Sequence, residues 1–224
     1  MRRIHFVVFA LLLAVPAAAQ GKWDTIPEKS PDFRAIVDRF RKEPVVKGKI
    51  LFLGNSITEG GKWKRLLKDS SVINRGISGD ITYGILYRID DVVKRQPSKV
   101  FLLIGINDLA KGIPDEIIME NIFSIARKIK TGSPKTTVYI QSILPTSTAF
   151  PNFPNHKNKG DHITTINAQL RRYGDKLGYT FVDLYPEFLN GDGQLDSKLT
   201  YDGLHLNYAG YEKWVSFLKT KKYL

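Results

Sequence analysis

The sequence contains no cysteine among its 224 residues. Disulfide bonds, thiol nucleophiles and thiolate metal sites are therefore excluded. A chain of this length buries roughly 70% of the surface that its unfolded form exposes, so a hydrophobic core alone can hold it together. The 42% of hydrophobic and 25% of charged residues are typical of a globular protein with such a core.

Long hydrophobic runs are scarce as well. One mainly apolar run, residues 4–15, lies between Arg2 and Arg3 on one side and the alanines at 17–19 on the other. It is shorter than the roughly 20 residues that a membrane-spanning helix needs. The order of charged, apolar and small residues is typical of a secretory signal. We therefore expect a cleaved signal peptide over residues 1–19, a secreted or periplasmic protein without stable membrane insertion, and a single domain over residues 20–224.

No recognisable nucleic-acid-binding motif accompanies the formal net charge of +12. The 34 lysine and arginine residues are scattered among 22 acidic ones, and only Lys219, Lys221 and Lys222 form a tight group. Nucleic-acid binding usually needs a basic stripe on a known module. We therefore expect no nucleic-acid partner. The excess charge indicates a solvated basic surface or, alternatively, attraction to acidic glycans and anionic surfaces.

Short apolar segments alternate with patterns of helical spacing along the chain. The apolar segments, expected as strands, are residues 49–53, 72–74, 100–104, 137–143 and 180–183. The helical patterns cover residues 31–42, 81–92, 118–129, 163–177 and 208–219. Near-continuous apolar strands are typical of a sheet covered on both faces. The alternation predicts an α/β fold, a three-layer α/β/α sandwich with a mainly parallel sheet.

Polar and glycine-rich segments follow the ends of the expected strands. Residues 54–60 follow the first strand, 74–80 the second, 105–108 the third, and 202–205 come after the fifth. In open parallel sheets, sites gather beyond the carboxyl ends of the strands. We therefore expect these segments, far apart in the sequence, to meet at one edge of the sheet.

Histidine is scarce too, which narrows the choice of a general base. Of the four histidines, His5 falls in the expected signal peptide, and only His205 has an aspartate, Asp202, three residues before it. A serine hydroxyl becomes a good nucleophile when an imidazole held by a carboxylate takes its proton. We therefore predict Ser56 as the nucleophile, His205 as the general base and Asp202 as the group that orients it.

Acyl transfer also needs hydrogen-bond donors for the oxyanion that develops on the carbonyl oxygen. The backbone N–H groups of Ser56 and Gly76 and the side-chain amide of Asn107 can supply them. Gly76 has no Cβ, so a substrate can approach its backbone. These three residues are our predicted oxyanion hole.

Each of these residues also has a purely structural interpretation. Ser56 and Glu59 match the capping box of a helix N-terminus. Asn107 is typical of a turn or cap, Asp202 of a turn, and His205 can be a buried structural histidine. A metal site at Asp202 and His205 lacks a close second histidine and a third ligand, so no metal is expected. The combined pattern, four polar segments in order at strand ends, favours catalysis over four coincidences.

The four segments resemble those of the SGNH hydrolases, also called GDSL esterases and lipases. The four residues for which that family is named correspond to Ser56, Gly76, Asn107 and His205. The resemblance extends from about residue 49 to the C-terminus. It implies the catalytic roles given above, a flavodoxin-like parallel sheet of five strands in the order 2-1-3-4-5, and no cofactor.

A narrower resemblance points to one branch of that family. Residues 74–80, 105–110 and 141–145 are similar to those of sialate O-acetylesterases and platelet-activating-factor acetylhydrolases. One departure is Asn55, which stands where the family usually has aspartate; we expect activity to be retained and the local hydrogen bonds to change. Thr58 breaks the Gly-x-Ser-x-Gly pattern of α/β-hydrolases.

This branch implies an esterase that hydrolyses short-chain, mainly acetyl, esters through an acyl-enzyme. A secreted enzyme of this kind would act on a small molecule or a glycan ester, such as acetylated sialic acid or polysaccharide. The alternatives are a lipid-directed esterase, lysophospholipase or thioesterase of the same fold, and an inactive glycan-binding module. Residues 145–162, with Phe150, Phe153 and His156, form an expected long loop at the same edge as the site.

Overall fold

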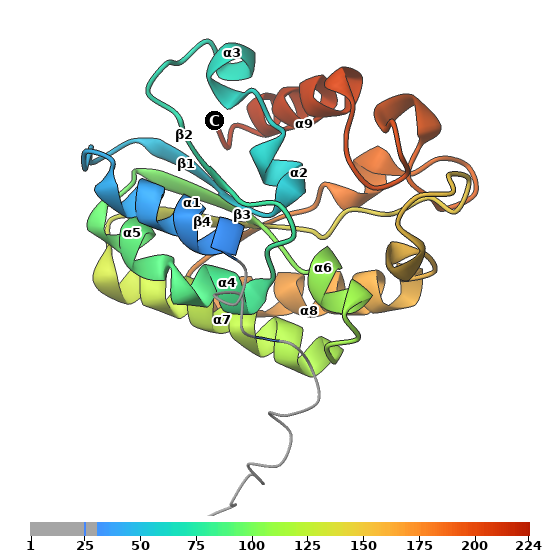
Figure 1. Cartoon of the computed structure of the whole chain (residues 1–224), viewed down its shortest axis with the longest axis horizontal. Helices are drawn as coiled ribbons and strands as arrows, with labels where there is room; N and C mark the ends of the chain where they lie inside the picture. The colour runs from blue at the N-terminus through green and yellow to red at the C-terminus, as the bar shows by residue number, and fades with distance from the viewer. Residues whose placement is uncertain (1–24, 26–30) are drawn as a thin grey trace, which may run out of the picture.

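The computed structural model describes residue 25 and residues 31–224, so the expected signal peptide lies outside the described residues. Its centre is a five-stranded sheet in the order β2-β1-β3-β4-β5, and every neighbouring pair is parallel (Figure 1). The strands are β1 (Ile50–Gly54), β2 (Ile73–Gly76), β3 (Lys99–Leu103), β4 (Thr137–Gln141) and β5 (Thr180–Val182). The expected strand order is confirmed.

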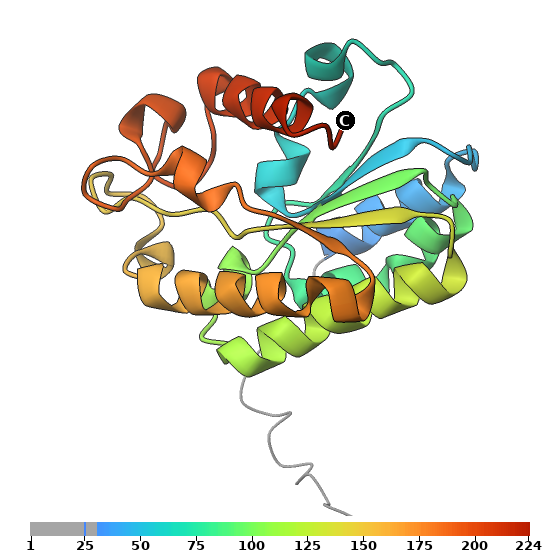
Figure 2. The same ribbon diagram turned by 180° about the vertical axis from the view of Figure 1, so that it is seen from behind.

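Helices cover both faces of the sheet, as the two opposite views show (Figures 1 and 2). On one face lie α2 (Ser56–Glu59), α3 (Trp63–Leu67) and α9 (Tyr208–Thr220). On the other lie α1 (Pro31–Lys42), α4 (Thr82–Tyr87), α5 (Ile89–Lys94), α7 (Asp115–Gly132) and α8 (Gly160–Leu177). The connections also contain α6 (Ile106–Ala110) and the 3-10 turns η3 (Pro154–His156), η4 (Tyr185–Phe188) and η5 (Ser197–Leu199). The expected three-layer sandwich is confirmed.

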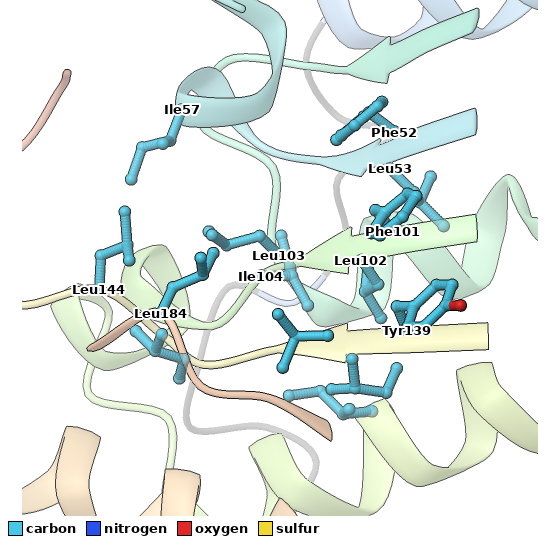
Figure 3. Packing of buried hydrophobic residues seen from close by; sticks show 14 of the residues in the cluster. Phe52, Leu53, Ile57, Phe101, Leu102, Leu103, Ile104, Tyr139, Leu144 and Leu184 are labelled. Atoms are coloured by element: carbon cyan, nitrogen blue, oxygen red, sulfur yellow. The ribbon is translucent and has the colours of Figure 1, made fainter. Parts of the chain in front are cut away.

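Aromatic side chains cross the sheet as a continuous stack. Phe52, Phe101 and Tyr139 occupy matching positions on β1, β3 and β4, and their ring centroids lie 5.0 and 4.6 Å apart (Figure 3). Trp63 of α3 stacks on Phe52 at 3.8 Å. Cross-strand aromatic pairs stabilise a sheet beyond the area that they bury. This stack, together with the buried aliphatic residues of both faces, fixes the register that aligns the strand ends.

The helical pattern over residues 81–92 is interrupted at Arg88. The chain forms α4 and α5 as separate short helices, because the backbone of Arg88 departs from helical geometry (φ −112°, ψ 15°). The Arg88 guanidinium is buried and donates to the carbonyl oxygens of Gly54 and Arg75. The expected spacing of apolar residues was right, but the continuous helix was wrong.

Candidate active site

Ser56 is the first residue of α2, directly beyond the carboxyl end of β1. Asn55 is the N-cap of this helix, and its Oδ1 accepts from the N–H of Ile57 at 3.0 Å. The capping box expected as an alternative does not form, because Ser56 is not the cap and Glu59 accepts from the hydroxyl of Ser78. Asn55 keeps the acceptor oxygen that an aspartate would offer to this N–H.

Three of the predicted residues form one chain of hydrogen bonds. His205 Nε2 lies 2.9 Å from Ser56 Oγ, and His205 Nδ1 lies 2.7 Å from Asp202 Oδ2. Because the carboxylate can only accept, Nδ1 carries the proton and Nε2 presents its lone pair to the serine. The fold thus brings Ser56 next to His205, 149 positions later in the chain. Together with Asp202 they have the arrangement of a nucleophile, a base and an orienting carboxylate.

The Asp202 carboxylate has three donors around it. Burial opposes its ionisation, but the His205 ring and the backbone N–H groups of His205 and Leu204 donate to it and hold its pKa below the usual range. The carboxylate therefore stays charged at neutral pH. A charged carboxylate at this position stabilises the imidazolium that forms when His205 takes a proton.

Asn107 lies in α6, just beyond the end of β3, the strand paired with β1. Its Nδ2 donates to the carbonyl oxygen of Asp80 at 2.9 Å, and its Oδ1 lies 2.9 Å from His156 Nε2. Two bonds thus hold the amide in one orientation. Nδ2 has a second hydrogen, for which the described part of the chain offers no partner, so it can donate to a substrate.

Gly76 does not suit the donor role predicted for it. Its N–H already donates to the side-chain Oδ1 of Asn74 at 2.9 Å. A Cβ at this position would lie 2.1 Å from the backbone nitrogen of Glu59, so the space beside it is filled by α2. The absence of a side chain at Gly76 serves helix–strand packing, and we correct the expectation that its N–H faces the substrate.

Gly79 offers a better donor three residues later. It is exposed, has a φ of +75°, and has open space where a Cβ would lie. Its N–H has no hydrogen-bond partner within residues 31–224, and neither has the N–H of Ser56. Asp80, whose carbonyl holds Asn107, follows it directly. The sequence alone does not separate the two glycines, because both lie in the same polar segment.

Two carboxylates are buried beneath this loop. Asp80 pairs with Arg88 at 2.8 Å; burial raises the pKa of Asp80 to about 6 despite the guanidinium. Asp108 is fully buried and accepts from the backbone N–H and the hydroxyl of Thr82, so it caps the N-terminus of α4. Burial raises the pKa of Asp108 to about 7. The hydrogen bonds of these two aspartates fix the loop that carries Gly79 and the start of α4.

Aromatic rings flank His205 on the solvent side. The ring of Tyr201 lies nearly parallel to the imidazole at 6.0 Å, and the ring of Phe153 meets it edge-on at 5.1 Å. Tyr201 is 64% and Phe153 36% exposed. Phe153 belongs to the expected loop 145–162, which therefore lies at the site, although its last three residues form the start of α8.

Within residues 31–224, no cluster of three or more histidine, aspartate or glutamate side chains is arranged to hold a metal ion. In the same part of the chain, no helix combines the length and the apolar character needed to cross a membrane.

Comparison with known proteins identifies the family. Residues 52–213 match the GDSL-like Lipase/Acylhydrolase family. The chain is 26% identical to human platelet-activating factor acetylhydrolase IB subunit alpha1, over 85% of this chain and 78% of that protein. It is 27% identical to the rat alpha2 subunit, over 89% and 85%.

A solved structure agrees with this. A GDSL-like lipase from Bacteroides thetaiotaomicron superposes with a TM-score of 0.74 at 28% identity, covering 86% of this chain and 98% of that one. The chain therefore belongs to the GDSL-like lipase/acylhydrolase family, also known as the SGNH hydrolases, and is a carboxylic ester hydrolase.

Proposed function

We propose that the protein is an exported serine esterase that removes acetyl groups from carbohydrates. The observation that carries this proposal is the hydrogen-bonded chain from Asp202 Oδ2 through His205 to Ser56 Oγ, with distances of 2.7 and 2.9 Å. It stands at the carboxyl edge of a parallel sheet, where such folds place their sites. An inactive glycan-binding module would have no need for this intact arrangement.

The reaction proceeds in two halves. Ser56 Oγ attacks the ester carbonyl while His205 Nε2 takes its proton, and the oxyanion accepts from the N–H groups of Ser56 and Gly79 and from Asn107 Nδ2. The carbon–oxygen bond to the alcohol breaks, and His205 returns the proton to the leaving alcohol. Water, deprotonated by His205, then attacks the carbonyl carbon of the acyl-enzyme. The bond to Ser56 Oγ breaks, His205 returns the proton to Oγ, and the acid leaves.

The names of two relatives support a short acyl group, and the rings at the site support a carbohydrate alcohol. Two relatives aligned over more than four fifths of this chain are named as acetylhydrolases. A carbohydrate alcohol fits the two exposed rings of Tyr201 and Phe153 beside His205, because the apolar face of a sugar packs against aromatic rings. Residues 1–19, with the charge and apolar pattern of a secretory signal, support export to where glycans are found.

Hydrolysis of an acetyl ester on a lipid is the second candidate, since the named relatives act on platelet-activating factor. Few large apolar side chains are exposed in the described part of the chain, and of these only Tyr201 and Phe153 contact the His205 ring. A lipid chain would need a larger apolar surface. We therefore rank the lipid ester below the sugar ester.

The first test is Ser56→Ala, which removes the nucleophile. We expect kcat for p-nitrophenyl acetate to fall by about 10⁴-fold or more. Ser124→Ala, on α7, is the matched control and should retain activity. Normal hydrolysis by the Ser56→Ala protein would contradict the assignment.

The second test concerns the substrate. In a series of p-nitrophenyl esters, we expect kcat/KM to decline as the acyl chain grows beyond acetate, because the proposed substrate has a two-carbon acyl group and each added methylene must find room beside Ser56. Acetate release should be faster from acetylated sugars than from an acetylated phospholipid. A preference for acyl chains of about eight carbons or more would contradict the acetylesterase proposal.

A further inference from the structure

The side chain of Asn107 is held at both ends of its amide group. Nδ2 donates to the backbone carbonyl of Asp80, and Oδ1 lies 2.9 Å from His156 Nε2. A carbonyl can only accept, so the atom that faces Asp80 must be the nitrogen, and the oxygen faces His156. Since that oxygen can only accept, Nε2 of His156 must carry a proton.

His156 suits the role of a neutral donor. It is half-buried; burial lowers its pKa, and the nearby His205 and Lys159 lower it further. A neutral imidazole has one N–H, and the contact with Asn107 requires it on Nε2. Nδ1 then has a lone pair and no proton to donate. This agrees with the structure, in which Nδ1 is buried and has no hydrogen-bond partner in the described part of the chain. A neutral ring also avoids repulsion when His205 becomes charged.

The backbone around His156 is fixed independently of Asn107. Thr146 Oγ1 donates to the carbonyl oxygen of His156 at 3.0 Å, and the backbone N–H of His156 donates to the carbonyl oxygen of Phe153 at 3.0 Å. Phe153 has a φ of +52°, a strained value for a non-glycine residue. Its ring meets both His156 and His205 edge-on. These contacts fix the 3-10 turn η3, and with it the position of the His156 ring beside Asn107 of α6.

We propose that His156 is a positioning residue for the oxyanion hole: its Nε2–H holds Asn107 Oδ1, and so keeps Asn107 Nδ2 facing the ester carbonyl. This inference rests on the proposed function, in which Asn107 is an oxyanion donor. Without His156, the amide keeps only the bond to Asp80 and can rotate away. The ester still binds, but the oxyanion loses a preoriented donor.

Two substitutions at His156 separate positioning from general structure. His156→Gln places an amide N–H near the position of Nε2, whereas the shorter His156→Asn places one near Nδ1, out of reach of Asn107. We expect His156→Asn to lower kcat for p-nitrophenyl acetate by about 10- to 100-fold with KM within about twofold, because the lost bond acts in the transition state. His156→Gln should retain kcat within about threefold.

His162→Gln is the matched control, since this exposed histidine pairs with Asp115 and does not touch Asn107. It should leave kcat unchanged. Thermal unfolding of each variant measures any loss of stability. Equal losses of activity and stability in His156→Gln and His156→Asn would overturn the proposal, as would a normal kcat in His156→Asn.

A double-mutant cycle tests the coupling itself. Asn107→Ala alone should lower kcat by about 10²- to 10³-fold, the range for one oxyanion donor. Adding His156→Asn to Asn107→Ala should change kcat by less than about twofold, because the group that His156 holds is already gone. Losses that multiply would overturn the proposal.

The outcomes also separate this inference from the proposed function. If the wild-type protein does not hydrolyse p-nitrophenyl acetate, or Ser56→Ala still does, the proposed function fails and the inference fails with it. If Ser56→Ala abolishes activity while His156→Asn is normal, the positioning role alone is refuted.

Discussion

At the scale of single residues, Asp202 divides its two carboxylate oxygens between two tasks. Oδ1 accepts from the backbone N–H groups of Leu204 and His205, and Oδ2 accepts from the ring of His205. The first oxygen fixes the turn, and the second fixes the tautomer of the imidazole. An asparagine at this position would still accept from the backbone N–H groups of the turn, but it would not accept from the ring of His205.

Asp202→Asn should therefore lower kcat by about 10⁴-fold while leaving the fold intact. Its Oδ1 still accepts from the backbone, but its NH₂ group can only donate to His205 Nδ1. The proton of the neutral ring then lies on Nε2, which has no lone pair to take the proton of Ser56. Kinetics with p-nitrophenyl acetate and thermal unfolding measure the two effects. Asp175→Asn, an exposed aspartate on α8, is the control. Activity within tenfold of the wild type would contradict the role of Asp202.

Gly76 and Gly79 should respond in opposite ways to the same substitution. Gly76→Ala places a Cβ 2.1 Å from the backbone of Glu59, and we expect it to cost about 3 kcal/mol or more. Gly79→Ala meets open space and costs about 1–2 kcal/mol for its φ of +75°. Thermal unfolding of the two variants gives the comparison. A larger loss at Gly79 would contradict the packing role of Gly76.

The side chains proposed as catalytic could be predicted from the sequence, but one of the proposed backbone donors could not. Ser56, Asp202 and His205 reveal themselves by residue type and spacing, since a histidine three residues after an aspartate can reach it across one turn. The choice between Gly76 and Gly79 depends on the rotamer of Asn74, whose Oδ1 occupies the N–H of Gly76. A pattern of residue types contains no information on that rotamer.

At the scale of secondary-structure elements, Arg88 joins the segments that carry the site. Its guanidinium donates to the carbonyl oxygens of Gly54 and Arg75, near the ends of β1 and β2, and pairs with Asp80. Gly54, Arg75, Asp80 and Arg88 are all buried, so water cannot replace the guanidinium as a donor to these acceptors. The sequence pattern predicts the helical face at this position but not the break, because an arginine on an amphipathic helix is ordinarily exposed.

Arg88→Met should lower the free energy of unfolding by about 3–5 kcal/mol, because it leaves the buried Asp80 carboxylate without its counter-ion and takes one donor from each of two buried carbonyl oxygens. Arg88→Met with Asp80→Asn removes the uncompensated charge and should recover part of the loss. Urea unfolding of both proteins measures this. Equal stability of the single and double variants would contradict a charge-driven effect.

Asp108 gives the N-terminus of α4 a pH-dependent contact. Its pKa is about 7 in the folded protein, against 3.8 for an unperturbed aspartate. Between these values the folded state binds more protons than the unfolded state, so this group makes stability fall as the pH rises from about 4 to about 7. Asp108→Asn still accepts from Thr82 but does not titrate.

The difference in stability between wild type and Asp108→Asn should therefore shift by about 2–4 kcal/mol across that range, in favour of the variant at the higher pH. Unfolding measured at several pH values gives the two curves. If the stability of the two proteins changed with pH in the same way, Asp108 would not be the group responsible for the pH dependence.

At the scale of the whole molecule, the order of the strands assembles the site. Residues beyond β1 and β3 become neighbours because these strands pair in parallel, with Gly54 opposite Leu103. The alternation of apolar segments and helical patterns is sufficient to predict these layers. The conformation of loop 145–162 is not predictable in this way, because the contact of His156 with Asn107 depends on the left-handed backbone of Phe153 and on the position of α6.

The charge of the whole chain leads to the last prediction. The formal net charge is +12 for the full sequence and +10 without Arg2 and Arg3 of the proposed signal, and it attracts anions over about a Debye length, roughly 30 Å at 0.01 M salt and 10 Å at 0.1 M. An acetylated sialic acid has a carboxylate, whereas an acetylated xylose is neutral, and both offer the same acetyl ester to Ser56. Raising the salt from about 0.01 to 0.3 M should lower kcat/KM for the acidic sugar about 3- to 10-fold.

The neutral sugar serves as the control for this measurement, because salt that perturbed the fold or the chemistry would slow both substrates. A selective decline for the acidic sugar indicates that the basic surface attracts the glycan, since screening acts on charge and not on the ester. Equal salt dependence for the two sugars would refute the attraction. The excess of lysine and arginine would then be a solvated surface with no part in substrate binding.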